Sequence, residues 1–231
     1  MLKNIFQDFL SLIYPSYCYA CEEDLEKGEK TLCTSCRLNL PRAPFEVPTE
    51  NEILKRFWGK VKVENGFAFY KFEKKSKVQK LLHHLKYSGK EEIGITVGNW
   101  LGKELKEKNI RHQFDLIIPI PLHKQKLKKR GYNQADSFAI GLSESMEVPW
   151  SNSILKKIIA TETQTKKSRY ERFKNVENVF EVEEPELIKN KHILLVDDVI
   201  TTGSTFESAI TVLLSNGAEK VSIATIATAN R

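Results

Sequence analysis

The sequence predicts an α/β protein: a parallel β-sheet flanked by helices, preceded by a small four-cysteine module. Three observations support this prediction. Short apolar runs alternate with helical patterns from residue 116 onward, as expected for strands that are buried on both faces of a sheet. All four cysteines lie between Cys18 and Cys36. The 231 residues exceed the commonest domain size but fall short of two large domains, so one core with a small appendage is expected.

The elements follow from the spacing of apolar residues. Helical spacing predicts helices at residues 2–13, 77–87, 93–108, 134–146 and 205–215. Short apolar or β-rich runs predict strands at residues 66–72, 116–120, 153–159, 192–196 and 221–227. The proline-containing segment at residues 41–52 predicts an extended linker. Because ligands of such sheets bind beyond the carboxyl ends of the strands, we expect the functional site there.

Composition and charge narrow the class of protein. Hydrophobic residues make up 41% and charged residues 29% of the chain, which is ordinary globular usage and excludes a disordered chain. The net charge of +6 favours polyanionic partners, either phosphorylated metabolites or nucleic acid. The apolar runs are too short to cross a bilayer, and the N-terminal segment lacks a small-residue cleavage site. We therefore expect a soluble cytoplasmic protein without a membrane span.

The cysteines form two CxxC pairs, and eleven residues separate the pairs. Such pairs present four thiolates that can converge tetrahedrally on one Zn²⁺, whereas disulfides would be reduced in the cytosol. Four cysteine ligands leave no open position for water or substrate, so a structural zinc ion is predicted. A redox dithiol is the alternative. We predict a zinc module at residues 1–40, a linker at 41–60 and the main domain at 61–231, with these ligands: Cys18, Cys21, Cys33 and Cys36.

One strand end carries an unusual set of polar residues. Asp197 and Asp198 follow the predicted strand at 192–196, and adjacent carboxylates can accept hydrogen bonds from the vicinal hydroxyls of a ribose. A small-residue loop and a helix N-terminus come next, and both offer N–H groups to a phosphate. An aspartate that caps the helix is the alternative, but it would not explain both carboxylates and the loop. The loop residues are Thr201, Thr202, Gly203, Ser204 and Thr205.

A second candidate segment is strongly basic. Five cations and no acid lie between Leu122 and Gln134, and we interpret this segment as a loop that neutralises a pyrophosphate. A solvated basic surface is the alternative. The cations are Lys124, Lys126, Lys128, Lys129 and Arg130, of which we favour Lys124, Lys128 and Arg130 as ligands.

The strand end also resembles a known motif. Residues 196–205, VDDVITTGST, resemble the motif with which type I phosphoribosyltransferases bind 5-phosphoribosyl-1-pyrophosphate (PRPP). The likeness extends over most of the chain, through the CxxC pairs, HLKY at residues 84–87, IIPIPL at 117–122, RGYNQ at 130–134, and Gln164, Arg172, Asn175 and Phe180. Taken together, these features resemble the ComF family of competence-associated proteins.

The resemblance implies a type I phosphoribosyltransferase-like fold that binds PRPP with Mg²⁺. Asp197 and Asp198 would hold the ribose hydroxyls and Mg²⁺, residues 201–205 the 5-phosphate, and the segment after Ile120 the pyrophosphate. Two departures matter. Ile159 stands where the family pattern has a second arginine, which leaves Lys157 as the main basic residue of that strand. Thr201 stands where purine-salvage enzymes have an aspartate that serves the base, and a threonine hydroxyl is no general base near pH 7, so purine salvage is disfavoured.

Three functions remain open at the level of sequence. The first is a phosphoribosyltransferase that releases pyrophosphate from PRPP, although no acceptor can be identified. The second is a protein of DNA uptake in natural transformation that binds single-stranded DNA, with Tyr132 as a stacking residue. The third is a PRPP-sensing scaffold whose zinc module contacts a helicase or another protein of the uptake system.

Overall fold

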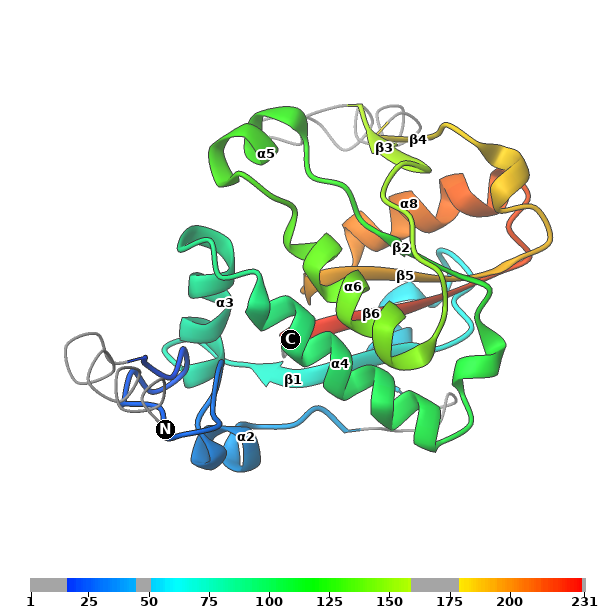
Figure 1. Ribbon diagram of the computed structural model, residues 1–231. Helices are drawn as coiled ribbons and strands as arrows, with labels where there is room; N and C mark the ends of the chain where they lie inside the picture. Colours follow the sequence, from blue (N-terminus) through cyan, green and yellow to red (C-terminus); the bar gives the residue numbers. More distant parts are fainter. Residues whose placement is uncertain (1–15, 45–50, 159–178, 230–231) are drawn as a thin grey trace.

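The computed structural model describes residues 16–44, 51–158 and 179–229 (Figure 1). The predicted helix at 2–13 and the residues Gln164, Arg172 and Asn175 lie outside this part of the chain. The central sheet has four parallel strands in the order β1 (Gly66–Phe72), β6 (Lys220–Ala229), β5 (His192–Ile200) and β2 (Leu116–Pro119). A parallel bridge between Ile117 and Trp150 continues the pairing beyond β2. The carboxyl ends of all four strands therefore meet at one edge.

Helices cover both faces of this sheet, as the alternating apolar pattern requires. Along β5, Leu194 and Val196 pack with α3 (Lys77–Tyr87), α4 (Glu92–Glu107) and α6 (Gln134–Met146). The residues between them, Ile193 and Leu195, face the other way and pack with α8 (Ser204–Ser215). Period-2 alternation along a strand thus divides the core into two layers. The predicted parallel sheet flanked by helices is confirmed.

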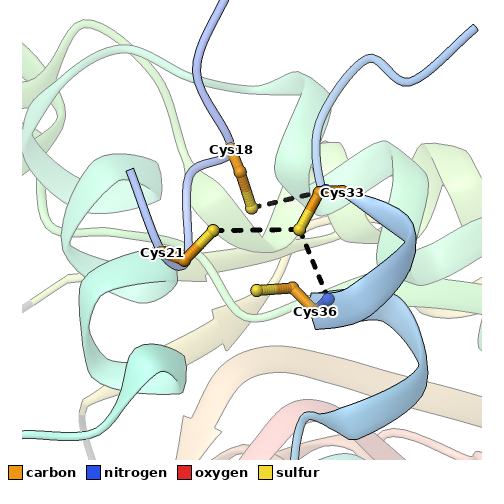
Figure 2. A group of neighbouring side chains, drawn as sticks. All are labelled: Cys18, Cys21, Cys33 and Cys36. Carbon is orange, nitrogen blue, oxygen red and sulfur yellow. Dashed lines mark hydrogen bonds between the residues drawn. The ribbon is translucent and has the colours of Figure 1, made fainter. Parts of the chain in front are cut away.

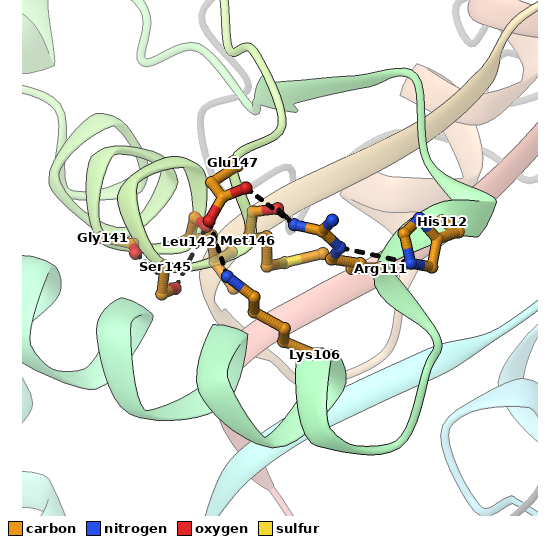
Figure 3. Close-up of polar contacts among 8 residues, drawn as sticks. All are labelled: Lys106, Arg111, His112, Gly141, Leu142, Ser145, Met146 and Glu147. Atoms are coloured by element: carbon orange, nitrogen blue, oxygen red, sulfur yellow. Dashed lines mark hydrogen bonds and ion pairs between the residues drawn. The ribbon is translucent and has the colours of Figure 1, made fainter.

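The helices α4 and α6 lie unusually close together because small residues face each other between them. A Cβ atom on Gly98 would stand 2.4 Å from the carbonyl oxygen of Phe138. At the end of this helix pair, Glu147 accepts hydrogen bonds from Lys106 at 2.6 Å and from Arg111 at 2.9 Å (Figure 3). These two cations lower the pKa of Glu147 to about 2. The contact joins the C-terminal ends of α4 and α6.

Two predicted elements differ from the observed ones. The predicted strand at 153–159 is not part of the central sheet. It contains β3 (Leu155–Lys157), which pairs in antiparallel fashion with β4 (Phe180–Val182). In β3, a buried residue is followed by an exposed one, so the strand lacks the fully apolar character of the central strands. The predicted linker at 41–60 contains a short 3₁₀ helix, η1 (Leu54–Phe57), with buried side chains.

The remaining elements are short. They are the helices α2 (Thr34–Asn39) and α5 (Lys124–Arg130) and the 3₁₀ turns η2 (Arg111–Gln113) and η4 (Pro185–Leu187). Within the three described ranges, no helix has both the length and the apolar character that a membrane span needs.

Candidate functional site

The four cysteines converge although they come from two separate segments (Figure 2). All four sulfur atoms lie within 4.8 Å of one another, and the cysteines form no disulfide. The Sγ atoms of Cys21 and Cys33 are 3.8 Å apart. Because Zn–S bonds measure about 2.3 Å, two sulfurs of a tetrahedral zinc site lie about 3.8 Å apart. The donor set and its spacing therefore fit a zinc ion, and the cysteine cluster could form a zinc module.

Backbone groups already favour the thiolate form of one cysteine. Burial alone would raise the pKa of Cys18, but the backbone N–H groups of Cys33, Cys21 and Ala20 donate to its sulfur and lower the pKa to about 7. Burial and the neighbouring thiols raise the pKa of Cys36. A bound cation would stabilise all four thiolates, so this arrangement suits a metal better than four protonated thiols.

The cysteine module packs directly on α3 and α4. Cys18 and Cys36 belong to the same buried cluster as the apolar face of α3. At its surface, Glu22 pairs with Lys80 of α3, and the Tyr19 hydroxyl donates to Glu92 of α4 at 2.8 Å. The module thereby helps to fix α3, the helix that reaches the strand ends.

The two adjacent aspartates, which we call the diacid pair, lie near the end of β5. Asp198 is 8% exposed, and Asp197 is half-buried. Burial and the nearby charge of Asp198 raise the pKa of Asp197 to about 7, against the opposing effect of Lys86 and Lys157. Two carboxylates held in a poorly hydrated place are strong ligands for a cation or for hydroxyl donors.

Lys86 near the end of α3 supplies a positive charge to the diacid pair. Its Nζ atom lies 3.0 Å from Oδ1 of Asp198. Sequence reasoning did not assign Lys86 a role beyond its place in the HLKY segment. The helix pattern alone could not show it, because its partner comes from a distant strand. His83 is exposed and His84 is half-buried on the same helix.

The loop after β5 presents its polar groups to solvent. Thr201, Thr202, Ser204 and Thr205 are exposed, and the hydroxyl groups of Thr202 and Ser204 lie 3.0 Å apart. The helix α8 begins at Ser204, and its N-cap Gly203, with φ of 85°, offers no side-chain hydrogen bond. The alternative prediction of an aspartate cap is therefore wrong. The first N–H groups of α8 carry the partial positive charge that attracts anions.

The basic segment is a helix rather than the predicted loop. In α5, lysine, glutamine, leucine and arginine favour helix formation, and Gly131 ends the helix with φ of 84°. Lys124, Lys126, Lys128 and Lys129 are exposed. Burial is the main cause that lowers the pKa of Lys157. The charge of Lys126 also lowers this pKa, whereas the opposite charge of Asp197 raises it. Lys157 of β3 thus lies near Asp197, and Lys126 of α5 lies near Lys157.

Two aromatic residues flank this helix in different ways. The Tyr132 hydroxyl donates to the carbonyl oxygen of Leu85, and the ring packs against the core, so Tyr132 is not free to stack on a base. Tyr87 is 64% exposed, and the guanidinium of Arg130 lies 5.5 Å from its ring centre. Arg130 also donates to Gln134 at 2.6 Å. The exposed ring beside the basic helix is therefore Tyr87.

Known proteins resemble this chain over most of its length. Residues 128–231 match the family model of the phosphoribosyl transferase domain. DNA utilization protein YhgH of Escherichia coli strain K12 is 28% identical over 92% of this chain and 96% of that protein. Competence protein F of Haemophilus influenzae is 28% identical over 89% and 94% of the two chains. Competence protein ComFC of Bacillus subtilis is 26% identical over 87% of this chain and 78% of that protein.

Solved structures give weaker matches. Glutamine PRPP amidotransferase from B. subtilis matches with a TM-score of 0.44 and 20% identity over 62% of this chain, which spans 30% of that enzyme's length. Purine phosphoribosyltransferase from Pyrococcus horikoshii matches with a TM-score of 0.37 and 20% identity over 58% and 73% of the two chains.

The sheet, the cysteine cluster and the relatives indicate the same kind of protein. The parallel sheet has helices on both faces, and the second part of the chain matches the phosphoribosyl transferase domain. The competence proteins and YhgH match 87–92% of the chain. The chain therefore has a phosphoribosyltransferase-type fold, and it is similar over most of its length to YhgH and to competence proteins F and ComFC.

Proposed function

We propose that this protein binds PRPP together with Mg²⁺ at the carboxyl edge of its sheet and takes part in DNA uptake during natural transformation. The observation that carries the proposal is the partly buried diacid pair, followed within a few residues by an exposed loop and an uncapped helix N-terminus. One half of this arrangement suits hydroxyl groups or a cation, and the other half suits a phosphate. PRPP supplies the hydroxyl groups and the phosphate, and the accompanying Mg²⁺ supplies the cation.

Each part of the site has a separate task in this proposal. Asp197 and Asp198 accept hydrogen bonds from the ribose hydroxyls, and their charge would hold Mg²⁺, which neutralises the pyrophosphate when bound. The exposed loop at residues 201–205 surrounds the 5-phosphate. Lys124, Lys128 and Arg130 of α5 approach the pyrophosphate. The helix gives these cations a common support and places Lys124 and Lys128, four residues apart, on the same face.

The cysteine module has a structural task in the same proposal. Four cysteine ligands would complete the coordination of zinc and leave no position for a substrate. The module packs on α3, which carries Lys86 to the diacid pair. We therefore infer that zinc would stabilise the position of α3 rather than take part in chemistry. A contact with a helicase or another uptake protein stays a prediction.

Calorimetry with PRPP and Mg²⁺ tests the site. Replacing both Asp197 and Asp198 with asparagine keeps their shape and removes their charge. PRPP affinity should fall by about 2–4 kcal/mol, since charge-assisted hydrogen bonds contribute roughly 1.5–3 kcal/mol each and are not additive. Asp115→Asn is the matched control, because Asp115 accepts a hydrogen bond from the His192 amide at the opposite edge of the sheet. Unchanged PRPP binding in a folded double variant would contradict the site.

Binding of single-stranded DNA is a second candidate function, which the exposed cations of α5 and the exposed ring of Tyr87 favour. Contacts with two to four phosphates would give a slope of log K against log salt of about −1.4 to −2.8. Replacing Lys124, Lys128 and Arg130 with glutamine should flatten this slope. The same change at Lys103, Lys189 and Lys220 serves as the control. Absence of oligonucleotide binding at low salt would exclude this function.

A further inference from the structure

Arg56 joins two strand ends that lie far from it in the sequence. Arg56 is part of η1 and is 8% exposed. Nη1 donates to the carbonyl oxygens of Ile200, at 3.1 Å, and Thr201. Nη2 donates to Oγ1 of Thr228 at 2.9 Å and to the carbonyl oxygen of Ala229 at 2.6 Å. One guanidinium group thus holds the beginning of the candidate phosphate loop against the end of β6.

These contacts determine where the peptide N–H groups of the loop point. In a trans peptide, the C=O and N–H bonds lie in one plane and point in opposite directions. The peptides in the described ranges are all trans. Because the carbonyl groups of Ile200 and Thr201 face Arg56, the N–H groups of Thr201 and Thr202 point away from it. That is the direction in which an anion can approach the loop without displacing the guanidinium.

The next residue of η1 supports the same loop. Phe57 is 2% exposed, and a Cβ atom on Gly203 would lie 3.1 Å from two atoms of its ring. Gly203 also has a φ of 85°, which favours glycine. The ring therefore limits how far the loop can sink toward the core. Arg56 and Phe57 together support the loop from the side opposite its exposed hydroxyl groups.

We propose that Arg56 is a positioning residue for the 5-phosphate of PRPP. It holds the peptide groups between Ile200 and Thr202 so that two N–H groups face the phosphate, and it does so without touching the ligand. This inference rests on the proposed function. A purely structural link between β5 and β6 would stabilise the protein, but it would not distinguish the phosphate end of PRPP from its pyrophosphate end.

Binding of two fragments of PRPP separates these roles. Arg56→Lys keeps the positive charge but loses the planar fork that reaches both pairs of acceptors. We expect the affinity for ribose 5-phosphate to fall about tenfold or more, given the net contribution of one or more hydrogen bonds, while affinity for pyrophosphate with Mg²⁺ stays within about twofold. Arg111→Lys is the control. Arg111 lies at the other edge of the sheet, so this variant should change neither affinity. Calorimetry measures the affinity of the wild type and of each variant for both fragments.

The outcomes distinguish this inference from the proposed function. A wild-type protein that binds neither PRPP nor ribose 5-phosphate overturns both. If the wild type binds PRPP but Arg56→Lys retains its affinity for ribose 5-phosphate, only the role of Arg56 is overturned. Equal losses for both fragments also overturn it, because they indicate general damage. If Arg56→Lys does not fold, hydrogen exchange of the backbone amides in the wild-type protein tests the proposal instead. Ribose 5-phosphate, and not pyrophosphate, must then slow exchange at Thr201 and Thr202, and unchanged rates overturn the proposal.

Discussion

Replacing Lys86 with methionine tests whether this lysine balances the charge of the diacid pair before any ligand binds. Two unit charges 3.0 Å apart attract each other by about 5–6 kcal/mol at an effective dielectric constant of about 20. Loss of hydration cancels most of this attraction. The side chains are 24% and 12% exposed, so the pair lies between the surface and the buried case.

These numbers bracket the expected cost. Exposed ion pairs contribute about 0–1 kcal/mol, whereas removal of one partner from a buried pair costs about 3–5 kcal/mol. For Lys86→Met we therefore expect the free energy of unfolding to fall by about 1–3 kcal/mol. Lys80→Met is the matched control on the same helix. Lys80 pairs with Glu22, and both side chains are at least 50% exposed, so this variant should lose less than about 1 kcal/mol.

Urea unfolding at pH 8 and low salt measures both variants. A divalent cation bound to the diacid pair would replace the missing charge, so added Mg²⁺ should raise the unfolding midpoint of Lys86→Met more than that of the wild type. The reasoning is refuted if Lys86→Met and Lys80→Met lose equal stability. A Mg²⁺ effect that is the same in wild type and variant would show that Lys86 does not act as the counter-ion.

Three further predictions concern other parts of the molecule. Cys33→Ser should release bound zinc, as elemental analysis would show, and should lower the melting temperature of the whole chain because the module shares its core with α3. Gly98→Ala should lower the free energy of unfolding in urea by about 1–3 kcal/mol, because its methyl group would meet the backbone of Phe138. Burial lowers the pKa of His192 below its ordinary value of 6.5, so stability that is present above this pH should decline as the pH falls below it. In His192→Gln, denaturant midpoints between pH 7 and 5 should fall less steeply.

Local patterns predicted the strands of the sheet and the helices that flank it. This was possible because the spacing of apolar residues within a segment reflects which side of that segment is buried. The helix predicted at 77–87 and the strand predicted at 66–72 have these bounds in the structure. The diacid pair could be recognised because two carboxylates, a small-residue loop and a helix N-terminus are consecutive in the sequence. The convergence of the cysteines followed from their spacing, and the structure confirms that they come together.

Other parts of the site depend on contacts that no local pattern records. Arg56 looks like an ordinary basic residue of a linker, because its acceptors lie 144 to 173 positions away. Lys86 is one of many lysines on helices, and only the packing of α3 brings it to Asp198. The basic segment is a helix and not the predicted loop, because charge says nothing about backbone conformation. Its helix-forming residues and the glycine that ends it determine the conformation.

The contacts of Arg56 also imply an order in which parts of the protein can form during translation. Arg56 leaves the ribosome long before its partners, since Thr228 and Ala229 follow it by 172 and 173 positions. Contacts between such distant residues form late, because the chain must first lose much of its freedom. The four cysteines, by contrast, all precede Arg56 in the chain. A nascent chain therefore holds all four cysteines well before the contacts of Arg56 with β6 can form, and a chain that terminates before β6 never forms those contacts.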